Sequence, residues 1–368
     1  MKIIHILHSL KFSGAEIMYV DAAPFFQEKG CELTVMATAT ELGQYAPFFE
    51  RAGYKVMHHP MPPLKRYIQR IRYYNVIIKL LKKEQFDVVH IHSSAARWGF
   101  AFCAWLANIK SVYTFHAVFP TRVLTYPYHC LIRWSAKIIF KCRFQAISDS
   151  VYDHELKLYH NKTTKVYNWY GHTRFFPAAE GEKFAVRKEL GISEKTLVLI
   201  SVGGCNDNKR HTDIIKALSL ILEKIPDCLY LHLGKGCTEA DEIQLAKDLG
   251  VNDKVRFCGN QEEVRKYLIA SDIYLMTSCF EGISITTIEA MACKTPAILY
   301  DVPGLRDFNK SGKNSVLIAE DYRLLADTVV ELIADKKEMT EMSKSAQDLV
   351  NQLFNIQNNA EEIYELYL

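Results

Sequence analysis

The chain has 368 residues, of which 49% are hydrophobic and 24% are charged, and its formal net charge is +3. This length exceeds one ordinary domain core and suits two. The composition excludes a disordered or low-complexity chain, and the lack of any uncharged apolar run of about 18 residues excludes a membrane-spanning helix.

The small net charge conceals an uneven distribution. Residues 51–148 hold 16 Lys and Arg against Glu84 and Asp87, a balance of +14, so the rest of the chain must carry −11 to reach the total of +3. A basic block of this kind attracts polyanions or anionic membrane surfaces.

Cysteine usage and the first residues indicate the compartment. The ten cysteines form no C-x-x-C pair and mostly fall in apolar segments, so we expect reduced core thiols, no disulfide framework and no zinc site. The N-terminal residues are too short and too interrupted by polar groups for a signal peptide. We therefore expect a cytoplasmic protein.

Short apolar strands alternate with helical patterns through the first half of the chain. The expected strands are 3–7, 33–37, 88–91, 112–115 and 144–147. This alternation predicts a doubly wound parallel α/β sheet, in which ligands bind at the carboxyl ends of the strands. The S-G-A-E segment at 13–16 follows the first strand and opens a helix expected to run to about Lys29; it lacks the G-x-G-x-x-G of a dinucleotide site.

Two stretches combine basic, aromatic and aliphatic residues at helical spacing. Pro63–Lys83 holds seven Lys and Arg with three Tyr and four Ile, and Arg122–Arg143 repeats the pattern. Either helix alone is typical of a solvated face over a core. Two of them in a domain with few acids favour peripheral binding at an anionic leaflet.

The second half repeats the alternation of strands and helices after a hinge expected at 169–181. Its expected strands are 197–202, 229–233, 255–257, 273–276, 297–299 and 315–318, which predict a second parallel sheet. Gly203 and Gly204 follow the first of these strands and precede Lys209 and Arg210. Free backbone with two cations suits a diphosphate, although no G-K-[ST] of a P-loop follows.

Ser278–Ile298 carries two carboxylates, Glu281 and Glu289, eight residues apart. The pattern predicts a strand, a tight turn at Gly282 and a helix that ends before Thr295. Unpaired N–H groups at the helix start suit an anionic phosphate, and a carboxylate beside them could bind sugar or ribose hydroxyls. The alternative is that these acids only complement the helix dipole.

This stretch also carries a resemblance. F-E-G at 280–282, E-A-M-A at 289–292 and Pro296 occur together in one superfamily, and the stretch resembles the signature of family 4 retaining glycosyltransferases of the GT-B fold, of the bacterial capsule and O-antigen type. The resemblance spans nearly the whole chain and is strongest over 201–317.

The resemblance implies an architecture and a mechanism. It implies two doubly wound Rossmann-like domains facing a central cleft: residues 1–170 bind the acceptor, 171–350 bind the nucleotide sugar, and a final helix within 351–368 crosses back to the first domain. Charge growing on the departing nucleoside diphosphate would be stabilised by cations and by the helix N-terminus.

It also implies roles for individual residues. His116, in T-F-H-A after a strand, would orient the transferred sugar near the acceptor, although a lone histidine there is more often structural. Glu281 would contact the sugar or phosphate, and Glu289 the ribose hydroxyls. Gly14 would contact the diphosphate, the alternative being a plain helix cap. The full expected donor site is Gly14, Gly203, Gly204, Lys209, Arg210, Gly259, Asn260, Gly282, Ile283, Ser284 and Glu289.

The sequence departs from the family pattern at four positions. Ser13, Trp169 and Lys294 stand where the family has Gly, and Gly204 stands where it has Arg. One phosphate contact is therefore in doubt, and Arg210 is the candidate replacement.

These observations predict a retaining glycosyltransferase that moves a sugar from a nucleotide sugar, with a UDP-sugar as the leading donor, to a glycan or polyprenyl-diphosphate-linked acceptor. We expect no metal requirement, because no D-x-D is placed as a ligand, and no nucleic-acid partner. The enzyme would be peripheral at the inner face of an anionic membrane. The alternatives are a nucleotide-sugar epimerase of the same fold and a non-catalytic glycan- or lipid-binding relative, which donor hydrolysis would discriminate.

Overall fold

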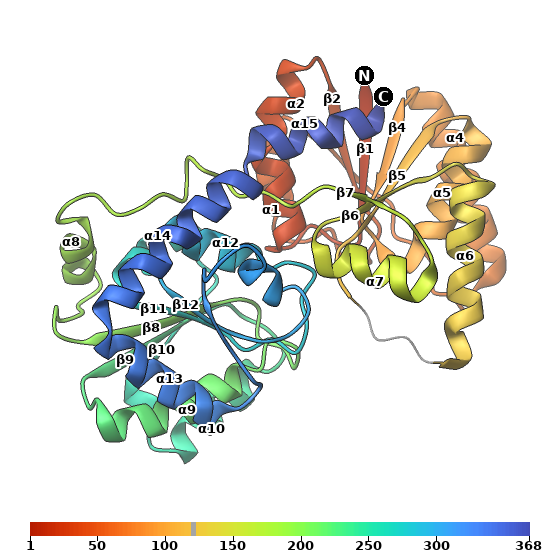
Figure 1. Ribbon diagram of the computed structural model, residues 1–368. Coiled ribbons are helices and arrows are strands. Elements are labelled where there is room, and N and C mark those ends of the chain that lie inside the picture. Colours follow the sequence, from red (N-terminus) through yellow and green to blue (C-terminus); the bar gives the residue numbers. More distant parts are fainter. Residues whose placement is uncertain (119–122) are drawn as a thin grey trace. The chain divides into compact units, whose positions relative to one another are not determined.

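The computed structural model describes residues 1–118 and 123–368 and divides into two compact units. The first unit is Met1–Gly171 together with Ile356–Leu368, and the second is His172–Asn355. Each unit is an open parallel sheet with helices packed against it (Figure 1).

The first sheet has seven parallel strands in the order β3-β2-β1-β4-β5-β6-β7. The strand order reverses between β1 and β4, whose residues 3–6 and 88–91 lie side by side. The strands are β1 (Lys2–Leu7), β2 (Glu32–Ala37), β3 (Lys55–His58), β4 (Val88–Ile91), β5 (Lys110–Phe115), β6 (Arg143–Ala146) and β7 (Thr164–Lys165).

Figure 1 shows α4, α5 and α6 on one side of this sheet and α1 and α2 on the other. Apolar residues of β1, β2, α2 and α15 form one continuous core on the α1 and α2 side. The helices of the unit are α1 (Gly14–Asp21), α2 (Ala23–Glu28), α3 (Ala46–Arg51), α4 (Tyr67–Glu84), α5 (Arg97–Ala107), α6 (Tyr126–Ile138), α7 (Asp149–Tyr159) and α15 (Ile356–Tyr367).

One prediction for this unit was wrong in detail, and two strands were missed. The single helix expected to run to Lys29 is two helices that meet at Ala22, because Pro24 has no N–H for the helix ladder and its ring crowds the preceding turn. Strands β3 and β7 were not predicted. Both lie at sheet edges, and their partly exposed residues lack a continuous apolar run.

The second sheet has six parallel strands in the order β10-β9-β8-β11-β12-β13, with its reversal between β8 and β11. Its strands are β8 (Leu197–Val202), β9 (Cys228–Leu233), β10 (Val255–Gly259), β11 (Ile273–Met276), β12 (Ala297–Tyr300) and β13 (Val316–Ile318). Its helices are α8 (Glu182–Glu189), α9 (His211–Lys224), α10 (Glu239–Asp248), α11 (Val264–Ala270), α12 (Ile285–Ala292), α13 (Tyr322–Ala334) and α14 (Lys336–Leu353).

The last helix, α15, belongs to the first unit although it follows the second in sequence. Tyr367 is fully buried, and its hydroxyl lies 2.6 Å from His90 Nδ1 in β4. Trp169, where the family has Gly, is also fully buried and donates from Nε1 to the Met18 carbonyl at 2.8 Å. Trp169 is thus part of the core of the first unit, and the chain leaves that unit after Gly171.

The two basic amphipathic stretches form α4 and α6. Arg122, at the start of the second stretch, lies outside the described residues. None of the helices in the described ranges is long and apolar enough to cross a membrane.

Candidate functional site

The loops after β8 and β11 lie side by side at the point where the order of the second sheet reverses. In parallel α/β sheets this reversal is where ligands bind. Several hydrogen bonds join the loops. Among them, Cys279 N–H donates to the Asn208 carbonyl at 2.8 Å, the Asn208 amide donates to the Phe280 carbonyl at 3.0 Å, and the Thr277 hydroxyl donates to the Lys209 carbonyl at 2.9 Å. The two sequence motifs thus form one surface.

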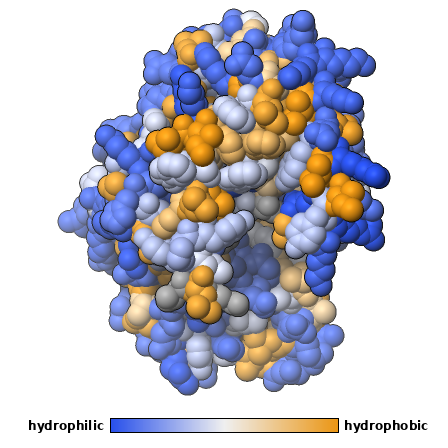
Figure 2. Space-filling model, turned by 90° about the vertical axis from the view of Figure 1, so that its right-hand side faces the viewer, coloured by the Kyte–Doolittle hydropathy of each residue, from blue (hydrophilic) through white to orange (hydrophobic). Residues whose placement is uncertain are grey.

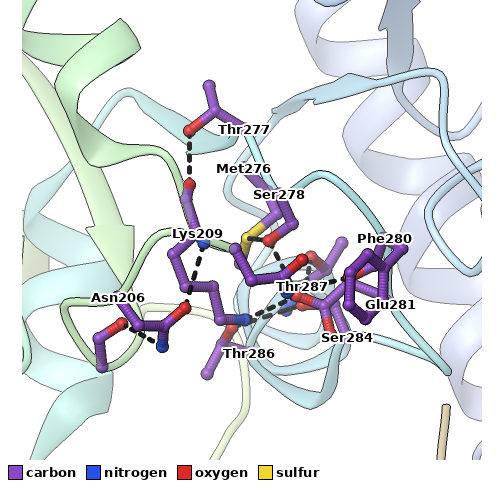
Figure 3. A network of polar contacts seen from close by, with 12 residues as sticks. Asn206, Lys209, Met276, Thr277, Ser278, Phe280, Glu281, Ser284, Thr286 and Thr287 are labelled. Atoms are coloured by element: carbon purple, nitrogen blue, oxygen red, sulfur yellow. Dashed lines mark hydrogen bonds and ion pairs between the residues drawn. The ribbon is translucent and has the colours of Figure 1, made fainter. Parts of the chain in front are cut away.

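Lys209 and Glu281 are in direct contact on this surface (Figure 3). Lys209 Nζ lies 2.7 Å from Glu281 Oε1, and the side chains are only 18% and 15% exposed. The Ser278 hydroxyl donates to the same oxygen at 2.7 Å. Glu281 Oε2 makes no hydrogen bond within the part of the chain that the structure describes. Because an ammonium has three N–H groups, Lys209 retains donors for a further anion.

Two glycines permit this close packing. A Cβ on Gly203 would lie 3.2 Å from Lys209 Cε, so the lysine side chain would have to move by a few tenths of an ångström. A Cβ on Gly304, whose φ is +84°, would lie 2.5 Å from the Glu281 carbonyl oxygen. Gly304 therefore requires a residue without a side chain, whereas a side chain at Gly203 would press on a lysine that can shift.

The first turn of α12 completes the surface. Ser284 is the N-cap, and its hydroxyl accepts from Thr287 N–H at 3.2 Å. The Thr286 hydroxyl donates to the Val202 carbonyl at 3.0 Å and lies 2.8 Å from the Tyr274 hydroxyl, so the helix start is fixed to β8 and β11. Gly282 and Ile283 are buried in the turn before it, and Glu289 is 5% exposed on the helix itself.

The helix also explains one departure from the family. Lys294 follows the C-cap of α12 with φ +61°, a left-handed conformation that glycine adopts most easily. The family glycine at this position is therefore a helix-ending residue, and Lys294 replaces it at some cost in strain.

The side chain of Arg210 contacts different residues from those that Lys209 contacts. Its guanidinium makes ion pairs with Asp213, at 3.1 Å, and with Glu320, and it lies over the Tyr300 ring. Its backbone is left-handed, with φ +50°, at the N-cap of α9. These contacts use donors that the sequence prediction assigned to a phosphate, so the role of Arg210 stays a prediction.

The remaining predicted donor residues of this unit border the same sheet edge. Gly259, with φ +64°, ends β10, and its carbonyl accepts from Gly234 N–H at 2.9 Å. Asn260 follows it and is exposed. Gly204 follows Gly203 in the loop after β8. A Cβ on Gly204 would lie 3.4 Å from the Lys235 carbonyl oxygen, an ordinary van der Waals contact.

His116 belongs to the first unit, where it ends a chain of three imidazoles. His116 Nε2 lies 3.0 Å from His92 Nδ1, and His92 Nε2 lies 3.1 Å from His5 Nδ1. Burial lowers the pKa of His116 to about 4 and that of His5 to about 3, so both rings are neutral at neutral pH.

His5, the ring at the other end of this row of imidazoles, determines which nitrogens of the three rings carry protons. His5 Nε2 is buried and has no hydrogen-bond partner among the described residues. A buried N–H without an acceptor is costly, which favours a proton on His5 Nδ1. His5 then donates to His92, and His92 donates to His116 Nε2. His116 therefore presents Nδ1–H as a hydrogen-bond donor.

Gly14 also lies in the first unit, at the first residue of α1. Ser13 occupies the N-cap position, but its hydroxyl donates to the Glu16 carboxylate rather than capping the helix backbone. Ser13 is thus not a plain serine cap, and the role of Gly14 stays a prediction.

Sequence reasoning missed the side chains that support these residues. Ser278 and Thr277 directly follow the buried strand β11, and a polar residue at that position is the signal that could have identified them. The contact of Lys209 with Glu281 had no local signal, because the two residues are 72 positions apart.

The geometry defines a two-unit α/β protein in which Lys209, Glu281 and the start of α12 form one surface at the switch point of the second sheet. The Anabaena protein Alr3699/HepE, solved in complex with UDP and glucose, has the same GT-B fold: it superimposes with a TM-score of 0.83 at 19% identity, covering 99% of this chain and 98% of that one.

The sequence matches two family descriptions that together cover most of the chain. Residues 12–174 match "Glycosyltransferase Family 4" and residues 182–349 match "Glycosyl transferases group 1". The chain belongs to the family 4 glycosyltransferases, which transfer sugars from nucleotide sugars, and this favours the glycosyltransferase over the epimerase and the non-catalytic alternatives.

Two relatives illustrate the range of the family. The N-acetyl-alpha-D-glucosaminyl L-malate synthase of Bacillus anthracis is 27% identical over 300 residues, 78% of this chain and 76% of the relative. The UDP-Gal:alpha-D-GlcNAc-diphosphoundecaprenol alpha-1,3-galactosyltransferase of Escherichia coli is 26% identical over 321 residues, 84% of this chain and 82% of the relative. The names of the two enzymes specify different acceptors.

Proposed function

We propose that this enzyme transfers a sugar from a UDP-sugar, with retention of configuration, to a polyprenyl-diphosphate-linked saccharide or related glycan during assembly of a cell-surface polysaccharide. The observation that carries the proposal is the Lys209–Glu281 pair at the switch point of the second sheet. UDP as the nucleotide is supported by the ligand of the Anabaena structure and the name of the Escherichia coli relative.

In this proposal the second unit binds the donor. Lys209 and the N-terminus of α12 face the diphosphate and stabilise the charge that grows on it as the glycosidic bond breaks. Glu281 Oε2 accepts a hydrogen bond from a hydroxyl of the transferred sugar, and Glu289 binds the ribose hydroxyls. Gly259 and Asn260 contact the base through their backbone, and Gly203, Gly204, Gly282, Ile283 and Ser284 give the phosphates access to main-chain N–H groups. No residue is assigned as a nucleophile, and no metal takes part in the transfer.

In the first unit, His116 orients the transferred sugar through the Nδ1–H that its tautomer presents. A neutral imidazole suits this role, because it can donate a hydrogen bond to a sugar hydroxyl while it carries no charge. Gly14 contributes a backbone contact to the diphosphate.

The acceptor side of the proposal depends on the outer surface of α4, α5 and α6. Fourteen of the twenty exposed large apolar side chains in the described part of the chain lie between Leu64 and Ile139. They include Tyr67, Ile68 and Ile71 on α4, each more than 60% exposed. Figure 2, which views the side of the molecule where these helices lie in Figure 1, shows apolar groups interspersed with hydrophilic ones.

A basic hollow lies close to the end of α6. Its volume is ≈ 470 Å³, and its lining includes Lys137, Lys141, Arg143 and Lys162. Exposed apolar side chains that enter the interface, together with cations for lipid phosphates, are the combination that holds a protein on an anionic bilayer. A lipid-linked acceptor would be reached there, at the cytoplasmic face of the membrane.

Donor binding and transfer test the first part of the proposal. A thermal-shift panel of UDP-, GDP- and ADP-sugars should show the largest stabilisation with a UDP-sugar, and the donor so identified should be transferred to a polyprenyl-diphosphate-linked saccharide. Stabilisation by GDP- or ADP-sugars alone would contradict the assignment of UDP. Transfer to L-malate but to no lipid-linked saccharide would contradict the acceptor.

Vesicle binding tests the membrane surface. The double variant Ile68→Gln, Ile71→Gln should lose co-sedimentation with phosphatidylglycerol vesicles, and high salt should weaken binding of the unmodified enzyme. Phe184→Gln is the matched control, because Phe184 is 51% exposed in the second unit. Equal binding to phosphatidylcholine vesicles, or no effect of the double variant, would overturn this part.

A further inference from the structure

Four potential metal ligands converge inside the second unit, beneath the loop that carries Lys209. They are Cys205 in that loop, His211 at the start of α9, His232 in β9 and Glu242 in α10. Each is at most 1% exposed, and their ligand atoms all lie within 4.8 Å of one another.

Four distances between these residues lie close to the edges of a small tetrahedron. His232 Nε2 lies 3.0 Å from His211 Nδ1, 3.0 Å from Glu242 Oε2 and 3.8 Å from Cys205 Sγ, and His211 Nδ1 lies 3.5 Å from Glu242 Oε1. Bonds of about 2.0–2.1 Å from zinc to nitrogen and oxygen, and about 2.3 Å to sulfur, place neighbouring ligand atoms about 3.3–3.6 Å apart. The four side chains need only small shifts to surround one ion.

The buried carboxylate gives a second, independent reason to expect a cation. Among the described residues Glu242 has no Lys or Arg partner, and its one hydrogen-bonded hydroxyl is that of Thr238, at 2.7 Å from Oε1. Glu242 Oε2 is buried, and its described neighbour, His232 Nε2 at 3.0 Å, is not aligned as a hydrogen-bond donor. A buried carboxylate oxygen without a well-aligned donor is costly, and a divalent cation at the centre of the cluster would compensate it.

We propose that Cys205, His211, His232 and Glu242 bind one Zn²⁺ in a closed, four-coordinate structural site. The cysteine would bind as thiolate, its proton passing to solvent, and the histidines as neutral imidazoles. Two negative ligands balance the two charges of the ion, so the buried site is neutral overall. The ligand set of nitrogen, sulfur and oxygen is one that zinc prefers.

The position of the site gives it a purpose. Cys205 and His211 lie on either side of Lys209 in sequence, and Cys205 N–H donates to the Lys235 carbonyl of the neighbouring loop at 3.2 Å. A zinc ion would thus fix both ends of the segment that carries Lys209 to β9 and α10. It would hold the proposed donor loop in place without taking part in the transfer.

This inference departs from the expectation of no zinc site drawn from the sequence. That expectation depended on the lack of C-x-x-C pairs. The four residues proposed here come from four different elements, so no local spacing indicates them.

Metal analysis tests the proposal directly. The full chain, purified without a polyhistidine tag, should contain about one zinc ion per chain by inductively coupled plasma mass spectrometry. Cys205→Ser and His232→Gln should reduce the bound zinc at least about tenfold. Cys237→Ser is the matched control, because Cys237 lies in the adjoining loop and its thiol donates to the Cys205 carbonyl without belonging to the cluster; it should retain the zinc.

Cobalt substitution tests the site in the wild-type protein, so the result does not depend on whether a variant folds. Wild-type protein stripped of metal and loaded with Co²⁺ should show the near-ultraviolet thiolate-to-cobalt absorption and the intense visible bands of tetrahedral Co²⁺. Metal-free protein as isolated, with no such absorption after loading, would overturn the proposal and identify the cluster as a hydrogen-bonded network of imidazoles and a carboxylate. Neither measurement uses activity, so a failure of the proposed function would not affect it.

Discussion

Replacement of Lys209 by methionine separates the structural role of the Lys209–Glu281 pair from its proposed role in transfer. The change removes the ammonium and keeps a side chain of similar length. Glu281 Oε1 then retains only the Ser278 hydroxyl, at 2.7 Å, in a site where both charged side chains are less than one-fifth exposed. Loss of one hydrogen bond between charged groups should lower the free energy of unfolding by about 1.5–3 kcal/mol.

The effect of Lys209→Met on transfer should be larger than its effect on stability, and the two effects should respond differently when Glu281 is also replaced. If Lys209 stabilises charge on the leaving diphosphate, kcat/KM should fall about 10²–10³-fold, which corresponds to about 2.7–4 kcal/mol. The double variant Lys209→Met, Glu281→Gln leaves no carboxylate without its cation. It should therefore recover stability towards the wild-type value, and its kcat/KM should stay low.

Urea denaturation and initial rates of transfer measure the two effects. Lys224→Met is the control, since Lys224 is 55% exposed, pairs with Asp327 at the surface and should change either quantity little. If Lys209→Met loses stability but keeps kcat/KM within about threefold of the wild-type value, Lys209 is only structural and the reasoning is refuted.

Three further predictions concern stability. Tyr367→Phe leaves His90 Nδ1 without its 2.6 Å partner and should lower the free energy of unfolding by about 1–2 kcal/mol in urea denaturation; an unchanged midpoint would contradict the contact. The pKa of His5 is 6.5 in the unfolded chain and about 3 in the folded protein, so the folded state binds this proton less readily. The free energy of unfolding should therefore be at its full value above about pH 6.5 and lower by about 2 kcal/mol at about pH 5. His5→Gln should reduce the slope of unfolding free energy against pH. Lys294→Gly should raise the melting temperature through a gain of about 0.5–1 kcal/mol, because φ is +61°, and a lower melting temperature would argue against strain there.

The sequence was sufficient to predict both sheets because parallel strands buried on both faces are continuous apolar runs. Strands β8, β11 and β4 begin and end at the predicted residues. The strands that were missed, β3 and β7, lie at edges where burial on one side is enough and the apolar run disappears.

The candidate site was predictable only as separate motifs. Local patterns placed Lys209, Glu281 and the start of α12 at the ends of strands, and parallel topology implies that such ends share one edge of a sheet. No pattern within a single segment reports which side chains meet. The ion pairs of Arg210 with Asp213 and Glu320, the imidazole chain that ends at His116 and the cluster around Glu242 therefore required the structure.

Calorimetric titration of UDP into the wild-type enzyme and into Glu289→Ala tests most directly whether the second unit is the donor site. Glu289 is 5% exposed on α12, the helix whose first turn borders the surface formed by Lys209 and Glu281. We expect measurable UDP binding that weakens at least about tenfold in the variant, because a carboxylate that holds two ribose hydroxyls contributes more than 1.4 kcal/mol. Equal affinity of a folded Glu289→Ala variant would contradict it.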